Sequence, residues 1–142
     1  MLLVDANVLL HAVNERAREH QAAHEWLLAA LDGPETIGLA WIALLAFLRL
    51  ATHPAVFPRP LSTQAAADIA ETWLAAPHTI AVEPTPRHLT LLRGLLVASG
   101  TAGNLVNDAH LAALALEHDA TVVSFDRDFA RFAGVRSQLP LA

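Results

Sequence analysis

Three aspartates stand at the ends of two short apolar segments that lie at opposite ends of the chain. Asp5 directly follows the run 2–4, and Asp126 and Asp128 follow the run 121–125. If the two segments are neighbouring parallel strands, their carboxyl ends meet at one edge of the sheet, where open α/β sheets bind ligands. We therefore expect these carboxylates to meet and to form the start of a metal site.

Asp108 is a fourth candidate, in the first turns of a helix predicted over 105–118. Ala112 and Ala115 follow it on the same side of that helix, and Asn104 lies one turn earlier. Small apolar neighbours place Asp108 on or beside the face that packs on the sheet. A carboxylate buried without a partner is very unfavourable, so an inward-facing Asp108 needs a counter-charge.

Each of these acids also has a simpler explanation. Asp5 and Asp126 are each well placed to cap the helix or helical turn that follows, which stabilises a helix by about 1 kcal/mol. Asp108 and Asp128 each lie in a first turn, where the helix dipole favours a negative charge. For any one acid alone, the local interpretation and the metal interpretation are both open.

Taken together, the four acids favour a cation. No arginine is spaced to pair with all of them, and carboxylates that share a pocket repel one another and raise each other's pKa values. Oxygen ligands without histidine or thiolate suit Mg²⁺, with Mn²⁺ as a substitute. Such an ion activates water and stabilises a leaving oxygen at a phosphodiester. The predicted ligands are Asp5, Asp108, Asp126 and Asp128.

Composition limits the class of protein. The chain has 142 residues, of which 54% are apolar and 16% charged, so we expect one domain, 1–142, with a large core. The absence of cysteine excludes disulfides and thiolate metal sites and fits the cytoplasm. A net charge of −5 argues against a general phosphate-binding surface, and all nine basic residues are arginines. The longest apolar run, 39–48, is about half a membrane span, so no membrane association is expected.

Strands and helices alternate along the chain. We predict strands at 2–5, 36–39, 79–82, 121–124 and 135–139, helices at 8–14, 18–31, 41–52, 62–76, 85–99 and 105–118, a helical turn at 128–132, and loops at 54–60 and 100–104. Apolar, β-branched strands between helices are typical of a mainly parallel sheet covered on both faces. The expected fold is a three-layer α/β/α sandwich with short strands.

Three segments of the chain resemble the motifs of the PIN-domain family, and within it the VapC-like toxin ribonucleases. The segments are 3–10 with Asp5, 104–115 with Asp108, and 121–129 with Asp126 and Asp128. The resemblance extends from end to end, and three motifs in this order are specific. It implies a PIN-like fold and a Mg²⁺-dependent endoribonuclease. It also implies a homodimeric toxin that a VapB-like antitoxin holds inactive.

One position departs from the family pattern. The family usually carries a glutamate on the helix after the second strand, but segment 41–49 contains no acid and the equivalent position is Ala46. The resemblance leaves Asn7, Ser124 or Asp128 to replace this ligand, directly or through water. A non-catalytic PIN-like binding module, which has lost a ligand, is therefore the alternative function.

A phosphoryl-transfer domain of the receiver or dehalogenase type would also place an aspartate after its first strand. Such domains generally use a lysine near the site, and this chain contains none. The Asp108 motif has no natural place in them either, so we consider this class disfavoured.

Several other residues are candidates for binding surfaces. Arg127 and Arg93 are candidate RNA contacts, because guanidinium groups suit phosphates. The apolar helix 41–50 and the region around Trp73 are candidate dimer or antitoxin surfaces, although a core position explains them equally simply. His110 is predicted to lie on the surface, on the side of its helix opposite Asp108, without a catalytic role.

Overall fold

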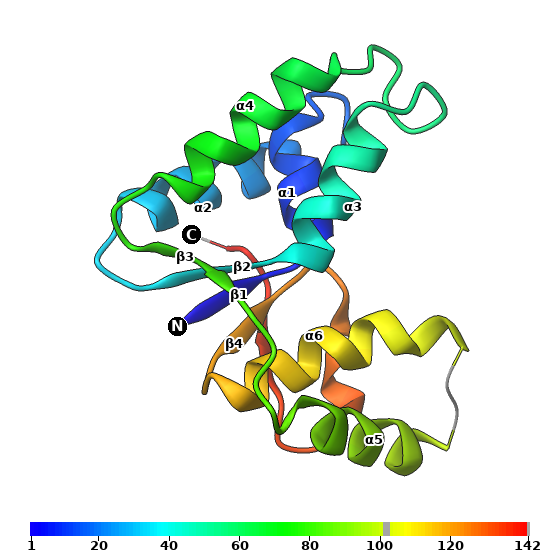
Figure 1. The fold of residues 1–142 in the computed structure, drawn as a ribbon. Helices are drawn as coiled ribbons and strands as arrows, with labels where there is room; N and C mark the ends of the chain where they lie inside the picture. Colours follow the sequence, from blue (N-terminus) through cyan, green and yellow to red (C-terminus); the bar gives the residue numbers. More distant parts are fainter. Residues whose placement is uncertain (101–102, 142) are drawn as a thin grey trace.

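The short apolar strands form one five-stranded parallel sheet (Figure 1). The computed structural model describes residues 1–100 and 103–141, without the side chain of Asn104. The strands are β1 (Leu2–Val4), β2 (Ile37–Ala40), β3 (Thr79–Val82), β4 (Thr121–Val123) and β5 (Arg136–Gln138). Their order is β3-β2-β1-β4-β5, so the first strand of the chain is the central one.

Helices cover both faces of this sheet, which confirms the three-layer α/β/α prediction. They are α1 (Ala6–Val13), α2 (His20–Asp32), α3 (Trp41–Ala51), α4 (Thr63–Leu74), α5 (His88–Ser99) and α6 (Val106–Glu117), with 3₁₀ turns η1 (Gly103–Leu105) and η2 (Arg127–Arg131). Helices α1 to α4 gather on one face and α5 and α6 on the other (Figure 1).

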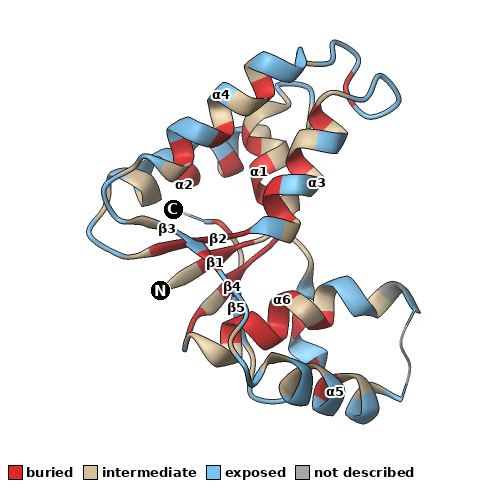
Figure 2. Cartoon of the chain, viewed as in Figure 1, coloured by how far each residue is buried: buried red, intermediate tan, exposed pale blue. Residues whose placement is uncertain are grey.

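The central strands are buried on both faces (Figure 2). Val4 and Val123 pack against α1 to α4, whereas Leu3 and Val122 pack against α5 and α6. This alternation follows from the period of two in a β-strand. Because both faces are filled with apolar side chains, polar chemistry is confined to the ends of the strands.

Most element boundaries fall within two residues of the prediction, and two of the differences have a clear physical reason. β1 ends at Val4 and α1 begins at Ala6, because Asp5 is the N-cap of α1. α5 begins at His88 and not at 85, because the amide of Thr85 donates to the Glu117 side chain. The loop predicted at 100–104 includes residues 101–102, which lie outside the described part of the chain.

The tryptophans divide between core and surface. Trp26 and Trp73 are each only 7% exposed, and the Trp73 ring lies 4.7 Å from that of Phe47, which confirms the core interpretation for Trp73. Trp41 is 45% exposed and Leu45 59% exposed on α3, so part of this helix presents an apolar surface. In the part of the chain that the structure describes, every helix is too short or too polar to span a bilayer.

Candidate metal centre

Asp5 lies at the carboxyl edge of the two central strands, as predicted. β1 and β4 are parallel neighbours with Val4 opposite Val123, and the Asp5 amide donates to the Val123 carbonyl at 2.9 Å. The first acidic strand end and the last therefore meet at the same edge of the sheet. This contact joins segments that are more than a hundred residues apart.

The Asp5 carboxylate has both a local and a long-range partner. Its Oδ1 accepts a hydrogen bond from the amide of Ala6 at 2.7 Å and caps α1. Its Oδ2 accepts one from the Ser124 hydroxyl at 2.7 Å, across the sheet. The capping interpretation is therefore correct for one oxygen, and the second oxygen is tied to β4.

Ser124 is the buried polar centre of this edge, with 2% of its surface exposed. Besides donating to Asp5, its hydroxyl accepts from Asn7 Nδ2 at 3.0 Å and from the Asp126 amide at 2.9 Å. Asn7 Oδ1 in turn accepts from the Phe125 amide at 3.2 Å. Ser124 and Asn7 thus hold Asp5 and the segment that leads to Asp126 in a fixed relation.

Directly beyond this network, Asp126 is the N-cap of η2 and Asp128 lies in its first turn. Asp126 Oδ1 accepts from the Asp128 amide at 2.8 Å and caps the 3₁₀ turn. Asp128 pairs with Arg131 at 3.2 Å, and 66% of its side chain is exposed. Asp128 therefore lies at the rim of the edge rather than inside it.

Asp108 lies in the first turn of α6 and is half-buried. Burial raises its pKa, and the charges of Asp5 and Asp126 raise it further; Arg131 opposes this shift and Asp128 adds to it. The pKa of Asp5 is also raised, mainly by burial and also by Asp126, against the hydrogen bonds from Ser124 and Ala6. Acids from three distant segments therefore act on one another at a single acidic mouth, formed by Asp5, Asp108, Asp126 and Asp128.

The acidic mouth is not a closed set of ligands. Among the described residues, no three histidine, aspartate or glutamate side chains are gathered at metal-binding spacing. Both oxygens of Asp5 and one of Asp126 are engaged in hydrogen bonds. The donor chemistry, all oxygen and electrostatically crowded, nevertheless fits a hard divalent cation; to bind one, the carboxylates would have to rotate.

Helix α3 contributes no acid to this site. Ala46 lies in the middle of the helix, which carries no aspartate or glutamate along its length. An acid that the sequence analysis did not identify, Glu83, follows β3 at the same edge of the sheet. Its Oε1 accepts from the Trp41 indole at 3.0 Å, at the start of α3.

A second polar cluster, absent from our predictions, links α5 to α6. The Glu117 side chain has no exposed surface. Its Oε1 accepts from the amide of Thr85 at 2.9 Å and from the Thr85 hydroxyl, and its Oε2 accepts from His88 Nδ1 at 2.6 Å. Burial alone would raise the pKa of Glu117, but the bonds from Thr85 and His88 outweigh it and lower that pKa.

His110 completes this cluster and is half-buried, so the prediction of a surface position missed its contact with His88. Its Nδ1 lies 2.8 Å from His88 Nε2, and the two rings meet edge to face. Burial and the neighbouring His88 lower the pKa of His110, against the attraction of Glu117. The helical spacing correctly separated His110 from Asp108, but the opposite side of α6 is covered by α5.

Two predicted RNA contacts are exposed. Arg127 lies in η2 directly after Asp126, and Arg93 lies on α5. Their predicted contacts with RNA stay predictions.

Comparison with known proteins identifies the family. The family model described as PIN domain matches residues 2–135. Ribonuclease VapC37 of Mycobacterium tuberculosis is 54% identical over 142 residues, covering 100% of this chain and 99% of the relative. Ribonuclease VapC33 of the same species is 41% identical over 141 residues, covering 99% of each chain.

Solved structures agree with this relationship at the level of the fold. The structure of VapBC2 from Rickettsia felis bound to a promoter DNA fragment aligns with a TM-score of 0.66 at 19% identity, covering 97% of each chain. The chain therefore belongs to the PIN domain family, and along its whole length it is similar to the ribonucleases named VapC.

Proposed function

We propose that this chain is a Mg²⁺-dependent endoribonuclease, with Mn²⁺ as a substitute ion, and the toxin of a VapBC-type system. The name of its relatives, Ribonuclease VapC, supports an RNA substrate. The observation that supports the metal is the meeting of the acidic strand ends, where the Asp5 amide bonds to the Val123 carbonyl. Burial raises the pKa of Asp108 there, and the charges of Asp5, Asp126 and Asp128 raise it further. A divalent cation would remove this repulsion.

Asp5, Asp108 and Asp126 are the residues that would hold the ion, with Asp128 at the rim. When bound, such an ion lowers the pKa of a water molecule and stabilises charge developing on a phosphodiester. Ser124 orients Asp5 through its hydroxyl, and Asn7 fixes the backbone before Asp126. The two residues thus take a positioning role beneath the carboxylates, which accounts for their polarity in a buried place.

The proposed partners are an RNA substrate, a VapB-like antitoxin and a second copy of the chain. Solved structures of similar fold include VapBC2 from Rickettsia felis and a toxin–antitoxin complex from Klebsiella pneumoniae, which supports the antitoxin. The exposed apolar surface of Trp41 and Leu45 on α3 supports a protein partner there. We expect the protein to act in the cytoplasm, where such an RNA would be made.

Cleavage of a fluorescent single-stranded RNA by the purified chain tests the proposal. We expect cleavage with Mg²⁺ or Mn²⁺ and none with EDTA. Asp108→Asn should reduce the rate by about a thousandfold, or about 4 kcal/mol of transition-state stabilisation. Asp68→Asn, which removes the same charge from an exposed site on α4, is the matched control and should cleave normally.

Thermal unfolding separates this proposal from the non-catalytic alternative. An ion that binds only the folded chain raises its melting temperature, and Asp108→Asn should abolish that rise. A chain that binds RNA but shows neither cleavage nor a metal-dependent rise would be a binding module. The absence of an acid at Ala46 is the observation that keeps this second candidate in view.

A further inference from the structure

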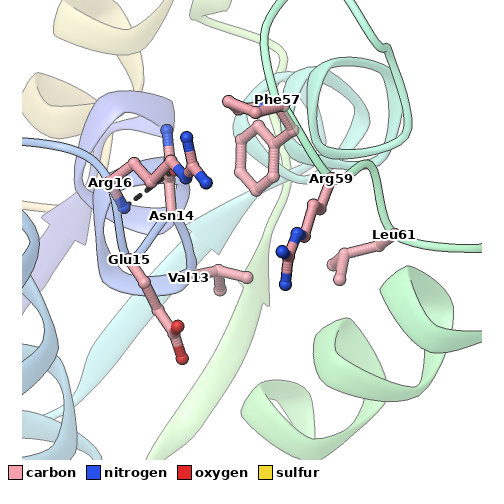
Figure 3. A pocket seen from close by; sticks show the side chains of 8 residues that line it. Val13, Asn14, Glu15, Arg16, Phe57, Arg59 and Leu61 are labelled. Atoms are coloured by element: carbon pink, nitrogen blue, oxygen red, sulfur yellow. Dashed lines mark hydrogen bonds between the residues drawn. The ribbon is translucent and has the colours of Figure 1, made fainter.

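A surface cavity of about 380 Å³ lies at the end of α1 opposite to Asp5 (Figure 3). Its walls come from the C-terminal end of α1 and from the segment between α3 and α4. The residues that line it are Val13, Asn14, Glu15, Arg16, Phe57, Pro58, Arg59 and Leu61. None of the four mouth aspartates lines it, so this cavity is separate from the acidic mouth.

Two arginines from separate segments share this cavity. Arg16 and Arg59 are both exposed, and neither takes part in an ion pair within the described part of the chain. Arg131 and Arg136, by contrast, are paired with aspartates. Guanidinium groups stay charged at all ordinary pH values, so the two repel each other unless an anion joins them.

Glu15 does not supply that anion. It lines the same cavity, but no ion pair joins it to either arginine. Figure 3 shows its carboxylate pointing away from Arg16. Glu15 also lines a second cavity, formed with α2 and α4. The positive charge of the arginine cavity is therefore open to a ligand from outside.

The backbone on both sides of the cavity is held in place. Phe57 is 4% exposed, and its amide donates to the His53 carbonyl at 3.0 Å. The Leu61 amide donates to the Ala51 carbonyl at 2.9 Å, so Arg59 lies on a segment anchored before and after it. On the opposite wall, the Arg16 amide donates to Asn14 Oδ1 at 3.2 Å. Anchored backbone limits the space that the two guanidinium groups can sample, which lowers the entropy lost when they bind an anion.

We propose that Arg16 and Arg59 form a phosphate-binding subsite, which binds the RNA backbone at a position several nucleotides from the cleaved bond. This inference rests on the proposed ribonuclease function. Helix α1, with 8 residues, spans about 12 Å between Asp5 and the near edge of the cavity at Val13. A stacked strand covers that distance in about four nucleotides. The chain has a net charge of −5 and acids at the mouth, so it repels RNA phosphates unless a cationic site such as this one binds them.

RNA affinity measured by fluorescence anisotropy tests the subsite. The measurements use the full chain carrying Asp108→Asn, so that the labelled single-stranded RNA stays intact. Arg16→Gln and Arg59→Gln should each weaken binding by about three- to tenfold at about 100 mM salt. The double variant should flatten the slope of log Kd against log salt by about 1.4, because each single-strand phosphate contact contributes about 0.7.

Arg18→Gln is the matched control. Arg18 is exposed, lies two residues from Arg16 and is outside the cavity, so its loss removes the same charge without touching the subsite. Its effect on RNA affinity should be below about twofold. Equal weakening by all three variants would mean general charge attraction and would overturn the subsite, as would no weakening by any of them.

A protein ligand is the remaining outcome that would overturn the subsite. If the variants lose affinity for an aspartate-rich peptide and keep their affinity for RNA, the cavity binds an acidic protein segment. Cleavage by the chain with Asp108 intact is scored separately. Cleavage with unchanged RNA affinity in the arginine variants rejects only the subsite, and arginine-dependent binding without cleavage rejects only the nuclease.

Discussion

The carboxylates of the acidic mouth and the carboxylate of Glu117 are held in opposite ways, although both groups depend on α6. At the mouth, burial and neighbouring acids raise the pKa values of Asp5 and Asp108. At the other end of the helix, Thr85 and His88 donate to Glu117 and lower its pKa. Helix α6 thus carries Asp108, whose charged form the fold disfavours, and Glu117, whose charged form the fold stabilises.

The contrast distinguishes a binding site from a structural contact. Both carboxylate oxygens of Glu117 accept hydrogen bonds from Thr85 or His88, so neither is available to a ligand. No described side chain donates a hydrogen bond to the Asp108 carboxylate, and Arg131 acts on it only through its charge. A carboxylate left without partners destabilises the free protein and favours a cation from solution. Stability and function therefore place opposite demands on acids of the same helix.

The largest expected effect is on the Glu117 side of the comparison. Glu117→Ala should lower the free energy of unfolding by about 3 kcal/mol, because the partners Thr85 and His88 are left unsatisfied in a covered place. Urea denaturation followed by circular dichroism measures this loss. Glu71→Ala, at an exposed position on α4, should change it by less than about 0.5 kcal/mol. Similar values for the two variants would contradict the contrast.

A smaller effect is expected on acidification. Because the folded chain lowers the pKa of Glu117 below its ordinary value of 4.5, its ionised form stabilises the fold at neutral pH. That contribution is present above about pH 4.5 and is lost as the pH falls through the lower, folded value. Denaturation curves between about pH 3 and 7 should show a shallower loss in Glu117→Gln than in the parent chain. The facing groups Thr85, His88 and His110 are the same in both.

The smallest effect is a gain at the mouth. With EDTA present, Asp108→Asn should raise the melting temperature by about 1–3 °C, because it removes a half-exposed charge that the folded chain disfavours. Scanning calorimetry measures this rise against Asp68→Asn, which should leave the temperature unchanged. A lower melting temperature would show that Asp108 has a stabilising partner and would remove the contrast with Glu117.

The fold and the meeting of the strand ends could be predicted from local signals. Apolar runs between helices indicate buried parallel strands, and Asp5 and Asp126 each follow such a run. The register Val4 opposite Val123 then places both at one edge. Even the departures at the start of α1 follow from known cap chemistry at Asp5.

The Glu117 cluster could not be predicted because its parts have no common pattern. Thr85 and Glu117 are 32 positions apart, and they meet only through the packing of α5 on α6. His110 was misjudged for the same reason, since helical spacing gives the direction of a side chain but not what covers it. The pairing of Arg16 with Arg59 in one cavity likewise depends on where the segment between α3 and α4 folds back.

The bond between Asp5 and Ser124 joins residues 119 positions apart, and this has a consequence during synthesis. The central strand β1 leaves the ribosome more than a hundred residues before its neighbour β4. Pairing between such distant segments is slow, because the entropy of closing a long loop is lost before any stabilising contact forms. The nascent chain therefore has no complete acidic mouth until the segment of Asp126 has also left the ribosome.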